Sequence, residues 1–157
     1  MQAIPKEDPQ RLVERYSDTV YRLALIRTKS THDAEDILHE VFLRYLKRKP
    51  VFESSEHEKA WFIRVTVNCA NSFLSSAWNR RTLPLGEVLP EHTQGEDSSE
   101  VLAAVAILPL AMRTAIHLHY FEQMSVKEIA DSMGRSESSV KTLLFRGRQR
   151  LKELLES

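Results

Sequence analysis

The sequence predicts an all-α protein made of two small helical domains joined by a flexible linker. Apolar residues recur three or four positions apart over long stretches, and no segment shows the sustained alternation of a strand. Only four glycines and six prolines interrupt the chain, so long helices are permitted. Charge is segregated, because residues 1–83 carry a net charge of +3, residues 84–100 carry −5 and residues 101–157 carry +2. We therefore expect domains at 1–83 and 99–157, with an acidic linker at 84–98.

Three helices are expected in the first domain. The first covers about residues 9–27, and the second covers about residues 33–47 after a cluster of capping residues. The second has acids at its start and cations at its end, which suits the helix dipole. Pro50 ends it, a polar loop follows at about 51–58, and the third helix covers about 59–78.

The second domain contains the strongest local signal. After two apolar helices, the second of which runs from about Pro109 to Phe121, Ser125 and Glu128 have the spacing of a capping box. Gly134 lies where a short helix must turn sharply, and a positive φ is expected there. A longer helix follows. A short helix, a glycine turn and a longer helix make a helix-turn-helix motif.

The longer helix has the composition of a helix that reads DNA. In this motif the second helix enters the major groove, and its N-terminal residues meet base edges. Small or cationic residues at its start allow close approach, and residues 138–152 include five cations and no acid. The alternative is that the cations of this basic amphipathic helix only face solvent. The capping box, the glycine turn and the polar start together favour DNA binding.

Composition limits the other classes of function. The single cysteine, Cys69, excludes an internal disulfide and lies on the apolar side of its helix. A reducing compartment, the cytoplasm, is therefore expected. No secretory signal is visible, and no apolar run approaches the ~18 residues of a membrane span, so membrane insertion is not expected.

No catalytic site is predicted. His32, Asp36 and His39 share a helix face, and histidine with carboxylate suits zinc, but this spacing recurs by chance in acidic helices. His117 and His119 are interpreted as surface and core-edge residues. No glycine-rich phosphate loop is present. We expect neither enzymatic activity, nor a metal, nor a cofactor.

Two sets of residues match motifs of a known family. The set in the second domain consists of Leu108–Pro109, Arg113, Leu118–Tyr120, Ser125–Met133, Val140–Lys141 and Phe145–Arg148. The set in the first domain consists of Asp33–Asp36, Glu40–Phe42, Trp61–Arg64 and Asn68. The second domain resembles sigma region 4, and the first resembles sigma region 2, of the sigma-70 family of bacterial RNA polymerase sigma factors. No separate region 3 fits between them, which is typical of the extracytoplasmic-function (ECF) type.

The resemblance implies a transcription initiation factor that directs core RNA polymerase to promoters. Asp33, Asp36 and Glu40 would then dock on the clamp helices of the polymerase β′ subunit, and part of the second domain would contact the β flap. Phe52, Arg64 and Asn68 would meet the melted −10 strand of promoter DNA. The major groove of the −35 element would be contacted by Ser136, Ser138, Ser139, Lys141, Thr142, Phe145, Arg146 and Arg148. An anti-sigma factor is a further expected partner.

Residue chemistry agrees with these roles only in part. An aromatic ring on a polar loop can stack on an unpaired base, and an amide can bond its edge. Phe52 could equally fold back into the core, and Asn68 could be tied into its own domain. Many relatives carry an aspartate and paired arginines where this chain has Ser72, Ser75 and Ser76, which weakens phosphate contacts near the −10 element. A stand-alone helix-turn-helix regulator is the alternative function; an enzyme built on the histidine-containing helix is a third.

Overall fold

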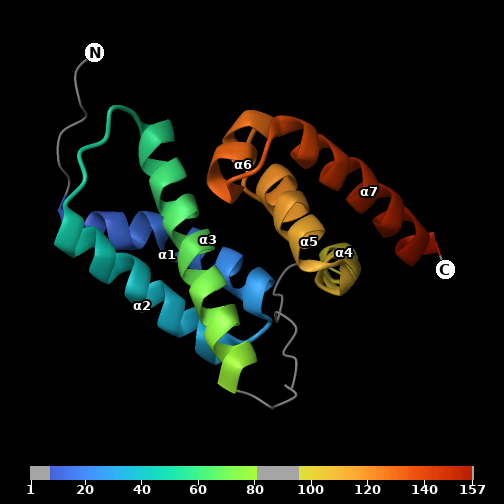
Figure 1. Ribbon diagram of the computed structural model, residues 1–157, viewed down its shortest axis with the longest axis horizontal. Helices are drawn as coiled ribbons and strands as arrows, with labels where there is room; N and C mark the ends of the chain where they lie inside the picture. The colour runs from blue at the N-terminus through green and yellow to red at the C-terminus, as the bar shows by residue number, and fades with distance from the viewer. Residues whose placement is uncertain (1–7, 81–95, 157) are drawn as a thin grey trace. The chain divides into compact units, whose positions relative to one another are not determined.

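The computed structural model describes residues 8–80 and 96–156, and all regular structure within these ranges is helical (Figure 1). The chain divides into two compact units, Met1–Leu85 and Gly86–Ser157. The predicted all-α class with two helical domains is confirmed. Most of the predicted linker lies outside the described residues, and the domain limits at 83 and 99 stay a prediction.

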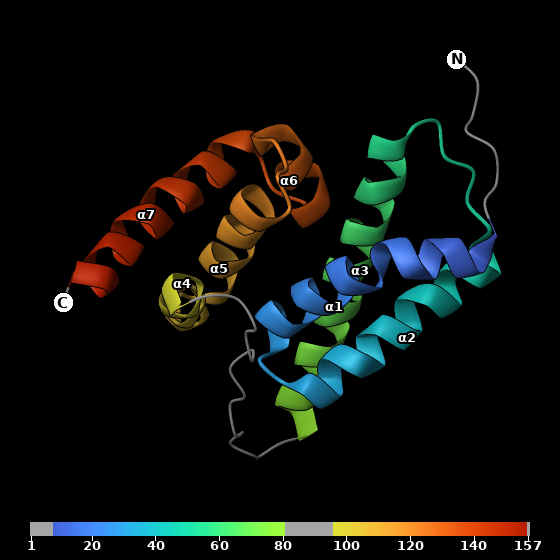
Figure 2. The same cartoon turned by 180° about the vertical axis from the view of Figure 1, so that it is seen from behind.

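Unit 1 consists of α1 (Pro9–Thr28), α2 (Thr31–Arg48) and α3 (Ser55–Arg80). All three helices pack against one another, and α3 runs across α1 and α2 (Figures 1 and 2). Their common core centres on Phe62, which is fully buried. The Tyr16 ring stacks on Phe62 with ring centroids 4.5 Å apart.

Local chemistry sets the ends of these helices. The Ser30 hydroxyl accepts a hydrogen bond from the Asp33 amide at 3.1 Å, which caps α2 as the sequence predicts. Lys29 and Lys49 close α1 and α2 in the left-handed conformation, with φ of 57° and 45°. The third helix begins at Ser55, four residues before its predicted start, because Ser54 acts as an N-cap that the sequence analysis overlooked.

Unit 2 consists of α4 (Glu96–Ile107), α5 (Leu110–Ile116), η1 (His117–Phe121), α6 (Val126–Met133) and α7 (Glu137–Glu156). The helix predicted from Pro109 to Phe121 is therefore α5 followed by a π-helical turn, η1. In α7, Val140, Leu144 and Gly147 are buried.

The predicted helix-turn-helix is present as α6, a turn at Gly134, and α7. Ser125 and Glu128 form the capping box, with the Glu128 carboxylate 2.8 Å from the Ser125 amide and the Ser125 hydroxyl 3.1 Å from the Glu128 amide. Gly134 has a φ of 67°, and its amide bonds to the Ala130 carbonyl. The Ser136 hydroxyl accepts from the Ser139 amide at 3.0 Å and so caps α7. These features orient α7 relative to α6.

Candidate nucleic-acid interface

The outward face of α7 presents the residues that the sequence predicts for DNA. A helix advances by about 100° per residue, so Ser138, Thr142 and Phe145 lie nearly opposite the buried Val140 and Gly147. All the predicted residues on α7 and at its cap are exposed, apart from the half-buried Ser139. The start of the face is small and polar, and cations follow it, as close approach to a major groove requires.

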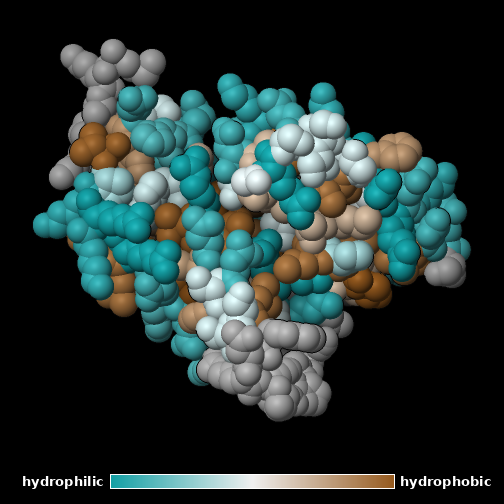
Figure 3. All heavy atoms as spheres, in the orientation of Figure 1, coloured by the Kyte–Doolittle hydropathy of each residue, from teal (hydrophilic) through white to brown (hydrophobic). Residues whose placement is uncertain are grey.

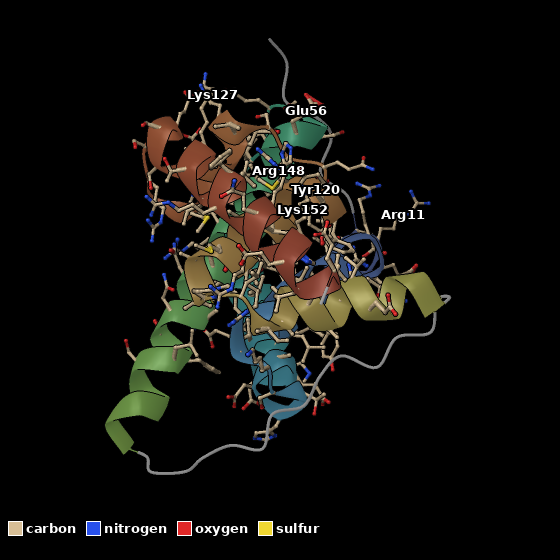
Figure 4. All side chains as sticks on the ribbon, turned by 90° about the vertical axis from the view of Figure 1, so that its right-hand side faces the viewer. Arg11, Glu56, Tyr120, Lys127, Arg148 and Lys152 are labelled. Atoms are coloured by element: carbon tan, nitrogen blue, oxygen red, sulfur yellow. The ribbon has the colours of Figure 1, made fainter. Side chains whose placement is uncertain are left out.

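Two side chains on this face differ in their contacts: Phe145 is exposed, and Arg148 is hydrogen-bonded. Phe145 is 56% exposed, so its ring is available to a partner. The Arg148 guanidinium donates a hydrogen bond to the Tyr120 hydroxyl at 3.1 Å. Figure 4 labels both residues. Tyr120 is itself half exposed and comes from η1. The bond therefore directs Arg148 along the edge of α7, and no sequence pattern predicted this partner.

Close packing joins α7 to α5 behind the exposed face. A Cβ atom placed on Gly147 would come within 2.8 Å of Cγ1 of Ile116. A larger residue would require the Ile116 side chain or one of the two helices to shift. The position of α7 is thus set both by the turn at Gly134 and by contact at Gly147.

Unit 1 presents a second set of predicted residues on α3. Arg64 and Asn68 are both exposed and lie one turn apart on the same face of the helix. Among the described residues, neither side chain makes a hydrogen bond or ion pair that would tie it into unit 1, so both can reach a ligand.

Phe52 differs from the predicted arrangement. It is only 5% exposed, stacks on Tyr45 with centroids 6.5 Å apart, and meets the edges of His57 and Trp61. In this structure its ring belongs to the core of unit 1, the second of the two placements that the sequence left open. Its contact with DNA stays a prediction.

The loop between α2 and α3, residues 49–54, is held by several bonds. The Glu53 amide donates to Nδ1 of His57 at 3.0 Å, and the His57 amide donates to the Ser54 hydroxyl at 3.1 Å. Val51, by contrast, is 58% exposed. Hydrophobic spheres stand out at the upper left of Figure 3, where Figure 1 draws this loop. The loop therefore combines a fixed backbone with one outward apolar side chain.

A buried network holds the first turn of α3 to α1. Glu58 is 2% exposed and accepts hydrogen bonds from the Tyr16 hydroxyl at 2.7 Å and from Arg15 at 3.1 Å. Burial, and then the Glu58 carboxylate, raise the pKa of Tyr16, so the phenol stays a proton donor. The network fixes the start of α3 and with it the end of the 49–54 loop.

The acids predicted to dock on polymerase lie along one side of α2. Asp36 is exposed, and Asp33 and Glu40 are half-buried. Glu40 pairs with Arg44 at 3.0 Å, and Asp36 lies 3.5 Å from His32. Both contacts are on the surface and contribute little stability, so the carboxylates remain available to a partner.

Beside these acids lies an apolar groove between α1 and α2 that the sequence analysis missed. Its volume is 590 Å³, and it is lined by Val13, Ser17, Leu38, His39, Phe42, Leu43 and Leu46. Leu43 and Leu46 are about half exposed, at 51% and 48%. These two leucines lie outside the buried stripe of α2, and this position in the sequence could have predicted an exposed apolar surface.

The remaining predicted residues are placed as follows. Cys69 is buried, as predicted, and burial raises the pKa of its thiol. His117 was wrongly predicted at the surface: it is 3% exposed and pairs with the buried Glu122 at 2.9 Å. Within the described ranges, no three histidine, cysteine or acidic side chains are grouped to hold a metal. No helix there is both long and apolar enough for a membrane span.

Fold and surface together define a class: a two-unit helical protein whose second unit is built to bind DNA through a helix-turn-helix. Comparison with known proteins then gives the family. The family model described as Sigma-70 region 2 matches residues 12–80, and that described as Sigma-70, region 4 matches residues 98–151. These matches cover the greater part of both units.

Curated relatives agree with these matches. The chain is 31% identical to the ECF RNA polymerase sigma factor SigM of Bacillus subtilis, over 91% of this chain and 92% of that protein. It is 33% identical to the ECF RNA polymerase sigma factor BldN of Streptomyces coelicolor, over 92% of this chain and 59% of that protein. The chain belongs to the sigma-70 family, in its ECF group, and is a promoter-specificity factor of RNA polymerase.

Solved structures show the same fold. The sigma factor RpoE of Bartonella quintana, in complex with the anti-sigma factor NepR, matches with a TM-score of 0.77 and 20% identity over 94% of this chain and 96% of that chain. CnrH, in complex with the cytosolic domain of CnrY, matches with a TM-score of 0.67 and 20% identity over 94% and 87% of the two chains. The prediction of the family is confirmed, and a stand-alone regulator is not favoured.

Proposed function

We propose that the two units of this sigma factor divide promoter recognition between them. Unit 2 reads the −35 element as duplex, with the outward face of α7 in the major groove. The observation that carries this proposal is that face, which is polar at its capped start, cationic further along, and opposite a buried stripe. Base contacts come from the first turns, and Arg146 and Arg148 neutralise phosphates.

Unit 1 has two tasks in this proposal. The acidic side of α2, with Asp33, Asp36 and Glu40, docks on the β′ clamp helices, and the neighbouring apolar groove adds buried surface to that contact. Arg64 and Asn68 meet the unpaired −10 strand, since an exposed cation and amide one turn apart can reach a phosphate and a base edge. The buried Phe52 ties the 49–54 loop to the core of unit 1.

Other partners follow from the family. Part of unit 2 contacts the β flap, and an anti-sigma factor binds the chain when transcription is off, as NepR binds RpoE in the solved complex. The protein acts in the cytoplasm, where it meets polymerase and promoter DNA. Polymerase performs the nucleotidyl transfer, so this chain needs no cofactor or metal and catalyses no reaction itself.

A pull-down of core RNA polymerase, followed by run-off transcription on fragmented genomic DNA, tests the proposal. We expect stable binding and new start sites that share −10 and −35 motifs. Lys141→Glu together with Arg146→Glu should abolish the start sites and leave polymerase binding intact. Arg11→Glu, a reversal at an exposed arginine on α1, is the control. Duplex binding without polymerase binding would instead support a stand-alone regulator.

A further inference from the structure

The outer face of α2 combines exposed leucines with charges of both signs. This face consists of Asp36, Glu40, Leu43, Leu46 and Lys47. Leu43 and Leu46 are 51% and 48% exposed. A helix advances by about 100° per residue, so the three charged side chains lie within about 60° of Leu43 around the helix axis. Both acids precede the leucines and the lysine follows them, so the charge on this face changes sign along α2.

The same surface carries apolar projections and a groove that can receive them. The groove between α1 and α2 has a volume of 590 Å³ and is lined by Leu43, Leu46 and, from α1, Val13, which is 41% exposed. A two-fold symmetric dimer uses the same patch on both subunits, so that patch must carry both halves of the contact. Leucines beside an apolar groove meet this requirement, because the leucines of one copy can enter the groove of the other.

The order of the charges selects the direction of such a pairing. If two copies of α2 packed in parallel, each charged side chain would face its own equivalent. In an antiparallel pair with its two-fold axis near Leu43, Glu40 instead faces Lys47 of the second copy. At a rise of about 1.5 Å per residue, Glu40 lies ~4.5 Å to one side of Leu43 and Lys47 lies ~6 Å to the other, so the opposite charges come level. Antiparallel helix dipoles also favour this direction.

The charged side chains of the face are available for this contact. Glu40 pairs with Arg44 of its own helix at 3.0 Å, and Asp36 lies 3.5 Å from His32. Both contacts are on the surface and contribute little, so a partner can compete for the carboxylates. Lys47 is exposed and makes no hydrogen bond or ion pair with the described residues.

We propose that a second copy of this chain binds the outer face of α2, in an antiparallel dimer with Leu43 near the two-fold axis and Glu40 paired with Lys47. The face is small for an interface, so the dimer is weak and depends on protein concentration. Because the β′ contact is assigned to the same face, the dimer and polymerase docking exclude each other. This exclusion rests on the proposed function of unit 1, whereas the dimer itself does not.

Sedimentation equilibrium of the full-length protein between about 1 and 200 µM tests for the dimer. The average mass should rise from that of one chain toward twice that mass as the concentration increases. Lys47→Glu should weaken association about 10-fold, because it places carboxylates opposite one another. Arg48→Glu is the matched control, since Arg48 is the adjacent exposed cation but lies about 100° around the helix. A protein that keeps the mass of one chain at every concentration would overturn the inference.

Reciprocal exchange of the two charges tests the antiparallel direction. Glu40→Lys combined with Lys47→Glu rebuilds an opposite-charge pair and should restore association to within about 2-fold of the original protein. Circular dichroism checks that both variants are folded. A folded double variant that associates no better than Lys47→Glu alone would rule out the antiparallel arrangement.

A cysteine near the axis tests the arrangement by cross-linking. A short bismaleimide should link two copies of Leu43→Cys about 10-fold faster than two copies of Arg11→Cys, because the dimer raises the local concentration of the thiols. Arg11 is exposed on α1 and lies about 160° around that helix from Val13. The native Cys69 is buried and does not compete for the reagent. Equal linking rates for the two variants would overturn the dimer.

Core polymerase added before the reagent tests the exclusion. Linking of Leu43→Cys should fall in proportion to the amount of the chain bound to polymerase. If polymerase binds and linking continues unchanged at saturation, the two contacts use different faces and the exclusion is wrong. If the chain dimerises and polymerase does not bind in the pull-down, the docking role of α2 fails and the dimer stands.

Discussion

The buried pair of His117 and Glu122 fixes the corner that leads into the helix-turn-helix. Both side chains are 4% exposed, and Nε2 lies 2.9 Å from the carboxylate. Nδ1 is buried and has no hydrogen-bond partner among the described residues. A neutral ring that donates from Nε2 suits this setting, since it leaves only a lone pair at Nδ1 rather than a buried N–H group.

Replacing His117 should therefore destabilise unit 2. We expect His117→Ala to cost about 2–4 kcal/mol, because it leaves a cavity and deprives a buried carboxylate of one donor. His117→Gln, which can place an amide donor near the same point, should cost less. Urea unfolding followed by circular dichroism measures both. An alanine variant as stable as the original protein would contradict the importance of this pair.

Cys69 gives a second prediction at the residue scale. Burial raises the pKa of its thiol, so at pH 8 less thiolate is present than in a free cysteine, and access is blocked as well. Alkylation by iodoacetamide in the native protein should be at least about 10-fold slower than in urea. Mass spectrometry over time measures the two rates. Equal rates would show that the α3 core is open in solution.

These residues also show where sequence reasoning succeeds. Cys69 was placed correctly because it shares a helical face with large apolar residues. His117 was misplaced because residues 113–118 are all buried, so this stretch of helix has no solvent face that a periodic pattern could mark. Phe52 lies in a loop, where no periodicity tells the inward direction from the outward one.

Among the elements, the two glycines of the helix-turn-helix region have different requirements. Nothing lies within 4 Å of a Cβ placed on Gly134, so a substitution there meets only the cost of a φ of +67°. At Gly147 the new Cβ meets Ile116 at 2.8 Å. The first position constrains the backbone of the turn, and the second constrains the distance between α5 and α7.

Substitutions should distinguish the backbone requirement at Gly134 from the packing requirement at Gly147. Gly134→Ala should cost about 1 kcal/mol, and Gly134→Asn less, because asparagine tolerates the left-handed region. Gly147→Ala should cost about 1–3 kcal/mol through overpacking against the Ile116 side chain, and we expect the adjustment between α5 and α7 to weaken binding to a −35 duplex as well. Thermal unfolding and fluorescence anisotropy measure these effects. Full −35 affinity in Gly147→Ala would mean that the helix spacing can relax freely.

The cations of α7 should differ from Tyr120 in their salt dependence. Arg146→Ala and Arg148→Ala should each reduce the slope of log K against log salt by about 1, the loss of one phosphate contact. Tyr120→Phe removes only the hydroxyl that orients Arg148, so it should weaken binding at fixed salt and leave the slope unchanged. Titrations of a −35 duplex with the assembled holoenzyme measure the slope, and Arg11→Ala is the control. An unchanged slope for Arg146→Ala would remove that residue from the interface.

Element boundaries were predictable where capping chemistry is local. Ser125, Glu128 and Gly134 fall where the spacing predicts them, because each satisfies backbone groups within a few residues. The groove between α1 and α2 was not predictable, because it depends on how two helices pack. Exposed Leu43 and Leu46 form a groove only together with Val13 of α1.

For the whole molecule, the order of the two units along the chain was the decisive sequence signal. Region 2 motifs followed by region 4 motifs define the family, and the matches at 12–80 and 98–151 confirm that order. Contacts with DNA and polymerase could not be derived in the same way, since they depend on surfaces of partners that this sequence does not encode. Separation of function between the units is therefore the experiment that addresses the molecule as a whole.

Removal of two carboxylates from α2 should separate polymerase binding from DNA reading. Asp36→Asn together with Glu40→Gln keeps size and hydrogen bonding but removes the charge that we assign to the β′ contact, and core polymerase binding should weaken about 10-fold. Glu35→Gln is the matched control, because Glu35 is exposed on the same helix but lies about 100° around it from Asp36. Stability should change little, since the contacts of Asp36 with His32 and of Glu40 with Arg44 are on the surface.

The same pull-down should give the reverse result for α7. Lys141→Glu with Arg146→Glu should bind polymerase normally and lose promoter selection, whereas the α2 variant should recover normal start sites when its concentration is raised about 10-fold. That recovery is expected because weaker docking lowers occupancy on polymerase without altering what α7 reads. If the α2 variant instead selects different start sites at saturation, its carboxylates take part in promoter reading, and the division of labour between the two units is wrong.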